Sequence, residues 1–104
     1  MNQIDWDVQR NIYRMIQELV INTIKHANAT EINLDFKSTK THLFIQYSNN
    51  GKHFDVKKAM KGIGLLSVTN RANFYDGTTT FHSDKENGST FLIELPLIKI
   101  MKHD

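Results

Sequence analysis

WDVQRNIYRMIQELVINTIKHA, residues 6–27, is an uninterrupted run without glycine or proline, and it decides the first element of the fold. One set of residues recurs at steps of three and four, the spacing of a single helix face: Val8, Ile12, Met15 or Ile16, Leu19, Thr23 and Ala27. Asp5 is a candidate N-cap, and Asn28 tolerates the left-handed conformation that often ends a helix. The run therefore predicts one long amphipathic helix.

Two short segments after this helix have the pattern of paired strands. Residues 31–36 alternate polar and apolar, residues 42–47 do so more loosely, and the polar residues 37–41 lie between them. Residues 49–51, Asn-Asn-Gly, follow the second segment, and these residue types tolerate positive φ at the end of a strand. The pattern predicts an antiparallel hairpin.

The second half of the chain adds a helix and another pair of strands. The expected elements are, in order, one or two helical turns over residues 55–61, a helix over 65–75, and strands over 78–82 and 90–95. Asp76-Gly77 is expected to stop the helix, and Pro96 closes the last strand. This order of elements predicts an α+β two-layer sandwich, in which a mixed, mainly antiparallel sheet carries the helices on one face.

The composition excludes several classes of protein. A chain of 104 residues, 39% of them hydrophobic, predicts one domain over residues 1–104 with a core over about residues 5–97. A net charge of +2, with basic residues spread among acidic ones, offers no footprint for nucleic acid. The lack of cysteine excludes disulfides, thiolate zinc sites and cysteine nucleophiles. No apolar stretch is long enough to cross a bilayer and residues 1–9 lack signal-peptide features, so we expect a soluble cytoplasmic protein.

Three polar residues share one face of the predicted helix beside its apolar stripe. Asn22 follows Glu18 by four positions and Lys25 follows it by seven, so their side chains line up. On most helices such a face is simply solvated. The same face would suit a nucleotide, because an amide oxygen ligates magnesium, a carboxylate orients water and an ammonium approaches phosphate.

Glycine-containing motifs occur at three places further along the chain. Gly51 ends the hairpin, Gly62-Ile63-Gly64-Leu65 opens the second helix, and Gly88-Ser89-Thr90 leads into the last strand. The start of a helix offers free N–H groups and a positive dipole end to phosphate. The dinucleotide and phosphate-loop motifs are absent, because Ser67 stands where the former needs glycine and no Gly-Lys-Ser or Gly-Lys-Thr occurs. Each cluster taken alone is equally typical of an ordinary turn.

In this order and spacing, the helix face and the glycine clusters resemble the N, G1, G2 and G3 boxes of one ATP-binding domain. That domain is shared by bacterial sensor histidine kinases, DNA gyrase, Hsp90 and MutL. The resemblance covers about residues 5–97 and implies the Bergerat ATP-binding fold. Within this superfamily the chain is most similar to sensor kinases of the nitrate and lipid-stress type, whose helix also reads Gln-Glu, then Asn, then Lys-His-Ala.

The resemblance implies a role for individual residues. It implies magnesium binding by Asn22 and, for Glu18, a catalytic role in orienting water or a magnesium ligand. It implies nucleotide binding by Asn22, Lys25, Asn49, Gly51, Gly62, Gly64, Leu65 and Thr90. Two positions depart from the family pattern, since Asn49 replaces the aspartate that reads adenine and His53 replaces a glycine, so we expect weakened or retuned ATP binding. Arg71 is expected to brace the second helix, with contact to the nucleotide as the alternative.

The resemblance also implies a function and its partners. The expected protein is the catalytic domain of a sensor histidine kinase, which binds ATP with Mg²⁺ and presents the γ-phosphate to a histidine on a separate dimerisation and phosphoacceptor domain, for later transfer to a response regulator. This sequence shows no such hairpin and no sensor domain, so we expect a monomeric fragment, either cytoplasmic or the cytosolic portion of a membrane-anchored sensor. Two alternatives stay open: a degenerate module of the same fold that acts as a partner-binding regulator, and an anti-sigma-factor-like serine kinase.

Overall fold

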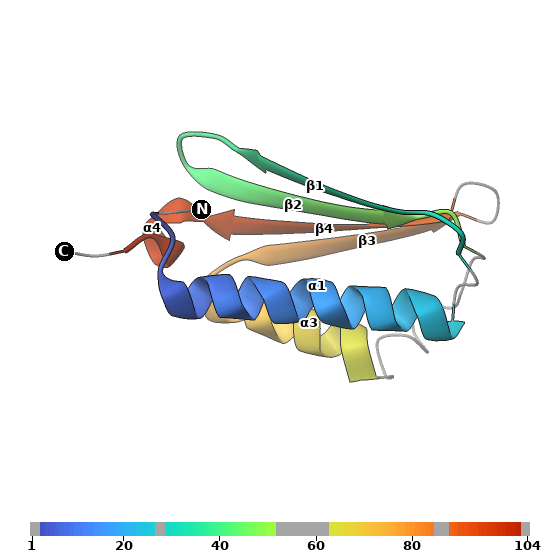
Figure 1. Cartoon of the computed structure of the whole chain (residues 1–104). Helices are drawn as coiled ribbons and strands as arrows, with labels where there is room; N and C mark the ends of the chain where they lie inside the picture. Colours follow the sequence, from blue (N-terminus) through green and yellow to red (C-terminus); the bar gives the residue numbers. More distant parts are fainter. Residues whose placement is uncertain (1–2, 27–28, 52–62, 85–87, 103–104) are drawn as a thin grey trace.

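Helices cover one face of a four-stranded sheet (Figure 1). The computed structural model describes residues 3–26, 29–51, 63–84 and 88–102. The elements are, in chain order, α1 (Trp6–His26), β1 (Ile32–Ser38), β2 (His42–Asn49), α3 (Ile63–Phe74), β3 (Thr78–Asp84), β4 (Gly88–Pro96) and α4 (Leu97–Ile100). This arrangement confirms the predicted α+β two-layer sandwich. The helical turns predicted over residues 55–61 and the helix end predicted at Asn28 lie outside the described residues.

Helix α1 packs its apolar stripe onto the sheet. Five residues of the stripe are buried: Val8, Ile12, Met15, Leu19 and Thr23. The helix begins as predicted, because the backbone N–H of Asp7 donates to Oδ1 of Asp5 at 2.9 Å and so gains a partner that the helix itself does not supply. Burying each large aliphatic side chain contributes about 1.5–3 kcal/mol. The stripe therefore anchors α1 along the sheet.

The two central strands supply the sheet's half of the core. The strand order is β1-β2-β4-β3, and all three pairings are antiparallel, so the sheet has no parallel pair among the described strands. Every second residue of the central strands is buried under the helices: Leu43, Ile45 and Tyr47 in β2, and Phe91, Ile93 and Leu95 in β4. The predicted hairpin of β1 and β2 is confirmed.

Helix α3 lies beside α1 on the same face of the sheet (Figure 1). Its buried residues are Leu65, Val68 and Ala72. It begins two residues before the predicted range of 65–75 and ends one residue before that range ends. In the part of the chain that the structure describes, no helix has both the length and the apolar character needed to cross a membrane.

The two ends of the described chain lie together at one end of the sheet. The N–H of Asp5 donates to the carbonyl of Ile100 at 2.8 Å, and Ile4 forms an isolated bridge with Met101. Ile4 and Ile100 are both buried, so the hydrophobic core extends beyond the expected range of 5–97 at each end. The sequence did not indicate α4, because four residues are too few to show a helical period.

Candidate functional site

One small pocket collects residues from several of the predicted motifs. Asn22 of α1, Asn49 of β2 and Leu65 of α3 all line it. The other lining residues are Leu19, Thr23, Tyr47, Phe81, Ser89 and Phe91. Its volume of about 10 Å³ leaves room for about one water molecule. These residues therefore form the floor of a candidate binding site. Residues 52–62, which link Gly51 to α3, lie outside the described part of the chain.

The side-chain amide of Asn49 has a defined orientation. Asn49 is the last residue of β2 and is only 5% exposed. The backbone N–H of Gly51 donates to its Oδ1 at 2.9 Å, and its Nδ2 donates to Oγ1 of Thr23 at 3.4 Å. Because a backbone N–H requires an acceptor, the oxygen is assigned to the Gly51 side and the NH₂ group to the Thr23 side. The NH₂ group keeps a second hydrogen, which makes Asn49 a donor as well as an acceptor at this position.

Thr23 connects α1 to β2 through its hydroxyl group. Its hydroxyl donates to the carbonyl of Leu19, one turn earlier in the helix, at 3.0 Å. The single hydroxyl hydrogen is then used, so Thr23 accepts from Asn49 and from the hydroxyl of Tyr47. Burial raises the pKa of the Tyr47 hydroxyl above its ordinary value. The sequence pattern had assigned Thr23 only to the apolar stripe, and no local signal identified its polar role.

Gly88 brings the last glycine motif against the end of β2. Its φ is +86°, and a Cβ on this residue would lie 1.9 Å from the carbonyl oxygen of Asn49. Only glycine fits this position without a shift of the backbone. Along the ladder that follows, Ser89 pairs with Asn49 and Thr90 with Ser48. The Gly88-Ser89-Thr90 motif, about forty residues after Asn49 in the sequence, is thus its direct neighbour in the structure.

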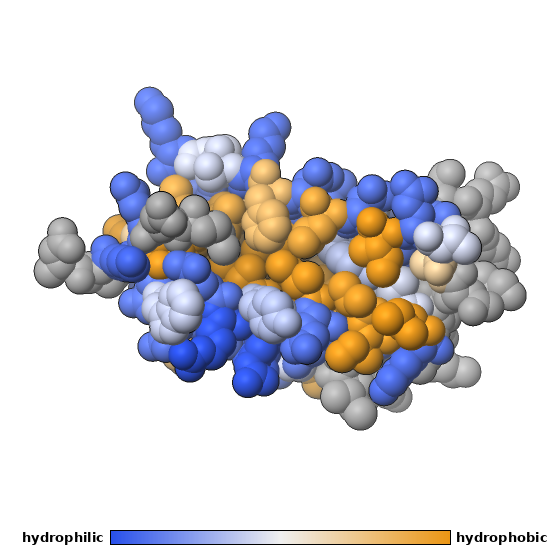
Figure 2. All heavy atoms as spheres, viewed as in Figure 1, coloured by the Kyte–Doolittle hydropathy of each residue, from blue (hydrophilic) through white to orange (hydrophobic). Residues whose placement is uncertain are grey.

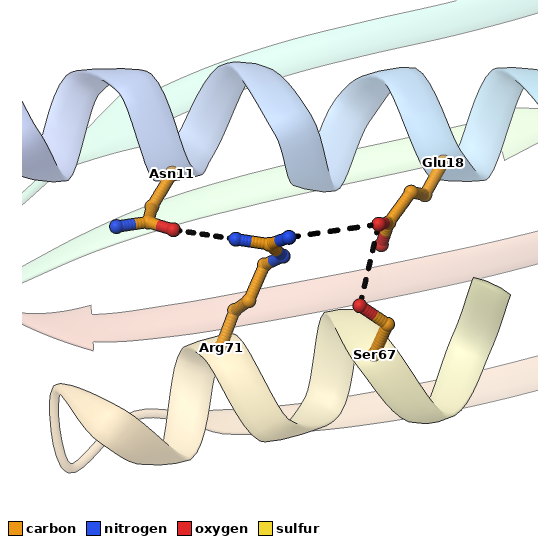
Figure 3. A network of polar contacts seen from close by, with 4 residues as sticks. All are labelled: Asn11, Glu18, Ser67 and Arg71. Atoms are coloured by element: carbon orange, nitrogen blue, oxygen red, sulfur yellow. Dashed lines mark hydrogen bonds and ion pairs between the residues drawn. The ribbon is translucent and has the colours of Figure 1, made fainter. Parts of the chain in front are cut away.

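A polar network joins α1 to α3 (Figure 3). The hydroxyl of Ser67 donates to Oε1 of Glu18 at 3.3 Å, and Nη2 of Arg71 lies 3.8 Å from the same oxygen. Nη1 of Arg71 also donates to Oδ1 of Asn11 at 2.6 Å. Arg71 therefore braces the two helices, as predicted. Within the described residues, Oε2 of Glu18 and Nε of Arg71 are buried without a hydrogen-bond partner.

The other predicted site residues have simpler surroundings. Lys25 is exposed on α1, Gly51 is buried after β2, and Gly64 lies in the first turn of α3. Gly62 and His53 lie outside the described residues. Among the described residues, no group of three or more histidine, aspartate, glutamate or cysteine side chains could hold a metal ion.

Solved structures share this fold. The ATP-binding domain of PrrB from Mycobacterium tuberculosis superposes with a TM-score of 0.73 at 21% identity, over 84% of this chain and 67% of that one. The histidine kinase AdeS of Acinetobacter baumannii superposes with a TM-score of 0.71 at 19% identity, over 84% of this chain and 46% of that one. At these identities the likeness shows the architecture alone.

Relatives at higher identity are histidine kinases. The signal transduction histidine-protein kinase/phosphatase DegS of Bacillus subtilis is 34% identical over 90 residues, which are 83% of this chain and 23% of DegS. DegS of Brevibacillus brevis is 30% identical over 91 residues, which are 86% of this chain and 24% of that protein. The chain thus spans about a quarter of the length of these relatives.

The family model for histidine kinase-, DNA gyrase B- and HSP90-like ATPases matches residues 7–99. The match runs from the first turn of α1 into α4, and all the residues that line the pocket lie within it. The chain belongs to the family of histidine kinase-, DNA gyrase B- and HSP90-like ATPases.

Proposed function

We propose that this chain is the ATP-binding catalytic domain of a two-component sensor histidine kinase. The observation that carries the proposal is the shared pocket floor, where Asn22, Asn49 and Leu65 meet from three separate elements. Membership in an ATPase family and similarity to DegS support the same function. In this proposal, residues 1–104 form a single catalytic domain.

Magnesium and the phosphates would lie between α1 and the start of α3. Mg²⁺ takes oxygen ligands and keeps several positions for water and phosphate, so the side-chain oxygen of Asn22 suffices as a protein ligand. The first turn of α3, which includes Gly64 and follows Gly62, would offer backbone N–H groups to the phosphates. Lys25, exposed on α1, would add a positive charge, and Leu65 would close the apolar side of the floor.

The adenine base would lie at the end of β2. Gly51 carries no side chain there, Asn49 presents an amide, and Thr90 brings a hydroxyl from the adjacent strand β4. A hydrogen bond to a charged group contributes about 1.5–3 kcal/mol, against about 0.5–1.5 for a neutral one. The amide at Asn49 would therefore weaken ATP binding by about 1 kcal/mol, or several-fold, relative to a carboxylate.

The γ-phosphate would pass to a histidine on a separate dimerisation and phosphoacceptor domain, and later to a response regulator in the cytoplasm. Glu18 would orient water or a magnesium ligand during this transfer, from the position in which Ser67 and Arg71 hold it. Glu18 would also have a structural role, because its carboxylate ties α1 to α3.

Titration with ATP and Mg²⁺ at millimolar concentration tests nucleotide binding. We expect measurable heat and a higher melting temperature, since a ligand at 100 times its Kd stabilises the folded state by about 2.7 kcal/mol. Asn22→Ala is expected to remove the magnesium-dependent part of this gain. Asn70→Ala, which changes an exposed asparagine of α3, serves as the matched control and should leave it unchanged. If neither heat nor a melting shift is observed, the proposal is wrong.

Transfer of labelled phosphate tests the reaction. The chain is mixed with a phosphoacceptor hairpin and radiolabelled ATP, and we expect an acid-labile label on the hairpin histidine. An acid-stable label would identify a serine kinase instead. Nucleotide binding without transfer to any supplied hairpin would contradict the kinase function and favour a regulatory module.

A further inference from the structure

The edge strand β1 has an apolar face that the helices leave uncovered. Leu34 and Phe36 pair with the buried Tyr47 and Ile45 of β2, so they point to the side of the sheet that the helices occupy. Leu34 is nevertheless 39% exposed, Phe36 47% and Ile32 40%. The main contacts of helix α1 with the sheet are to β2, and those of α3 are to β3 and β4. Figure 2 shows hydrophobic side chains gathered in a band between the strands and α1.

The outer edge of β1 also carries unpaired backbone groups. Among the described strands β1 has a single neighbour, β2. The N–H of Asn50 donates to the carbonyl of Glu31 at 3.2 Å, and the N–H of Thr39 donates to the carbonyl of His42 at 2.9 Å. In an antiparallel pair the direction of these groups alternates, so the odd-numbered residues of β1 bond to β2 and the even-numbered ones turn outward. The backbone N–H and C=O groups of residues 32, 34, 36 and 38 can therefore form hydrogen bonds with another strand.

The sequence of this edge is complementary to that of a second copy running antiparallel to it. Residues 31–37 read EINLDFK. When a second copy runs antiparallel about Leu34, Glu31 lies opposite Lys37 and Ile32 lies opposite Phe36. Asn33 then lies opposite Asp35, and Leu34 meets Leu34 of the second copy. Opposite charges and apolar side chains that face each other across antiparallel strands stabilise the pairing.

We propose that β1 is a docking surface for a second copy of this chain, with a two-fold axis at Leu34 that joins two four-stranded sheets into one. Outward groups belong to even-numbered residues, so the neighbouring registers place the axis at 32, 33, 35 or 36. An axis at 32 sets Leu34 and Phe36 against residues outside β1. An axis at 33 sets Glu31 against Asp35, which like charges disfavour. An axis at 35 sets Asp35 against itself, which like charges disfavour. An axis at 36 sets Leu34 against Ser38 and Ile32 against Lys40. The axis at Leu34 keeps the apolar residues together and forms two pairs of opposite charge.

This contact is made by the sheet edge of the domain itself and needs no dimerisation hairpin. The opposite edge, β3, is a poorer candidate, because α3 packs against it and Phe81 packs against the core. A second copy of the chain suits the edge of β1, because both charge pairs come from one self-complementary segment.

Sedimentation equilibrium of the 104-residue chain from micromolar to millimolar concentration tests the dimer. Lys37→Glu places two pairs of like charge across the interface and is expected to raise the dimer Kd by about tenfold. The double variant Glu31→Lys with Lys37→Glu is expected to restore the original Kd. Arg14→Glu makes the same charge change at an exposed site on α1 and should change nothing. A chain that stays monomeric at millimolar concentration overturns the proposal, and so does a dimer that Leu34→Lys leaves unaffected.

Disulfide trapping tests the register independently, because the chain contains no cysteine. On a two-fold axis, a hydrogen-bonded pair sets the two Cα atoms about 5.5 Å apart, within the range of about 4.4–6.8 Å that a disulfide spans. In a glutathione buffer we expect Leu34→Cys to form a disulfide-linked dimer at least about tenfold faster than Ile98→Cys, an exposed control on α4. Faster trapping of Phe36→Cys than of Leu34→Cys would overturn the proposed register, and equal rates for Leu34→Cys and Ile98→Cys would overturn the contact.

Discussion

Gly88 lies against the backbone of Asn49 so closely that a Cβ at position 88 would come within 1.9 Å of the Asn49 carbonyl oxygen. The contact joins the start of β4 to the end of β2, where the candidate base site lies. Two motifs that are distant in the sequence can therefore approach this closely only because residue 88 has no side chain.

Gly88→Ala is expected to lower the free energy of unfolding by about 2–5 kcal/mol. A left-handed φ costs an alanine about 1–2 kcal/mol, and overpacking against the Asn49 backbone adds about 1–3. Urea denaturation followed by circular dichroism measures the change.

Gly77→Ala is the matched control, because it changes a tightly packed glycine that lies away from the pocket. Its Cβ would lie 2.5 Å from the carbonyl oxygen of Glu94, so this variant is also expected to be destabilised, but away from the pocket. At a temperature where both variants are folded, only Gly88→Ala should weaken ATP binding. Equal ATP affinity in the two variants would contradict the link between Gly88 and the site.

Asn49→Asp is expected to strengthen ATP binding several-fold, because the carboxylate makes a charge-assisted hydrogen bond to the adenine amino group, worth about 1 kcal/mol more than a neutral one. The same variant should be less stable without ligand. The amide NH₂ group that donates to Thr23 is lost, and the Thr23 hydroxyl already donates to Leu19. Calorimetric titration and thermal melting measure the two effects.

The same exchange predicts a change in base preference. Asn49 offers both a donor and an acceptor, and it therefore accommodates a 6-oxopurine as well as adenine, whereas an ionised aspartate only accepts. We expect wild type to bind inosine triphosphate and ATP with similar affinity, and Asn49→Asp to favour ATP. Gln46→Glu adds one charge to an exposed position of the same strand and should leave the preference unchanged. An unaltered preference in Asn49→Asp would show that position 49 does not read the base.

Arg71→Leu is expected to destabilise the chain by about 1–3 kcal/mol. The substitution leaves the partly buried Glu18 carboxylate and the Asn11 amide oxygen without their guanidinium partner. Lys99→Ala removes the exposed ion pair with Asp76, at 3.2 Å, and should cost no more than about 1 kcal/mol. Denaturation midpoints compare the two variants, and equal losses would contradict a bracing role for Arg71.

Stability at high pH is expected to depend on Tyr47. Burial raises the pKa of its hydroxyl above the ordinary value of about 10 that the unfolded chain retains. The unfolded state therefore loses this proton first, and the contribution of Tyr47 is fully present below about pH 10 and is lost as pH rises through the folded pKa. Above about pH 10, the free energy of unfolding should fall more steeply in wild type than in Tyr47→Phe. Parallel curves in urea titrations at several pH values would contradict this.

The strand pattern shows how far sequence reasoning extends. Residues of β1 alternate polar and apolar more regularly than those of β2, and the two together predict the hairpin. Yet Ile45 is buried and Phe36 is largely exposed. Alternation indicates which face of a strand a side chain takes, whereas cover by a helix depends on where α1 packs across the sheet.

The polar network shows the same limit for the site. Asn22 and Asn49 were recognised from motif spacing, and the pocket contains both. Thr23 was assigned to the apolar stripe, because its partners Tyr47 and Asn49 lie 24 and 26 residues further along the chain. No short window of sequence contains such a pair.

The sequence by itself determined the periodic elements, the glycine motifs and the kinship with an ATPase family, because helical and strand spacing and glycine's conformational freedom are local properties. Only the tertiary structure decided that Asn49 donates to Thr23, that Arg71 ties α1 to α3, and that the edge of β1 stays open. These features depend on which side chains and backbone groups meet after the layers pack, and that is set by the fit of the whole core.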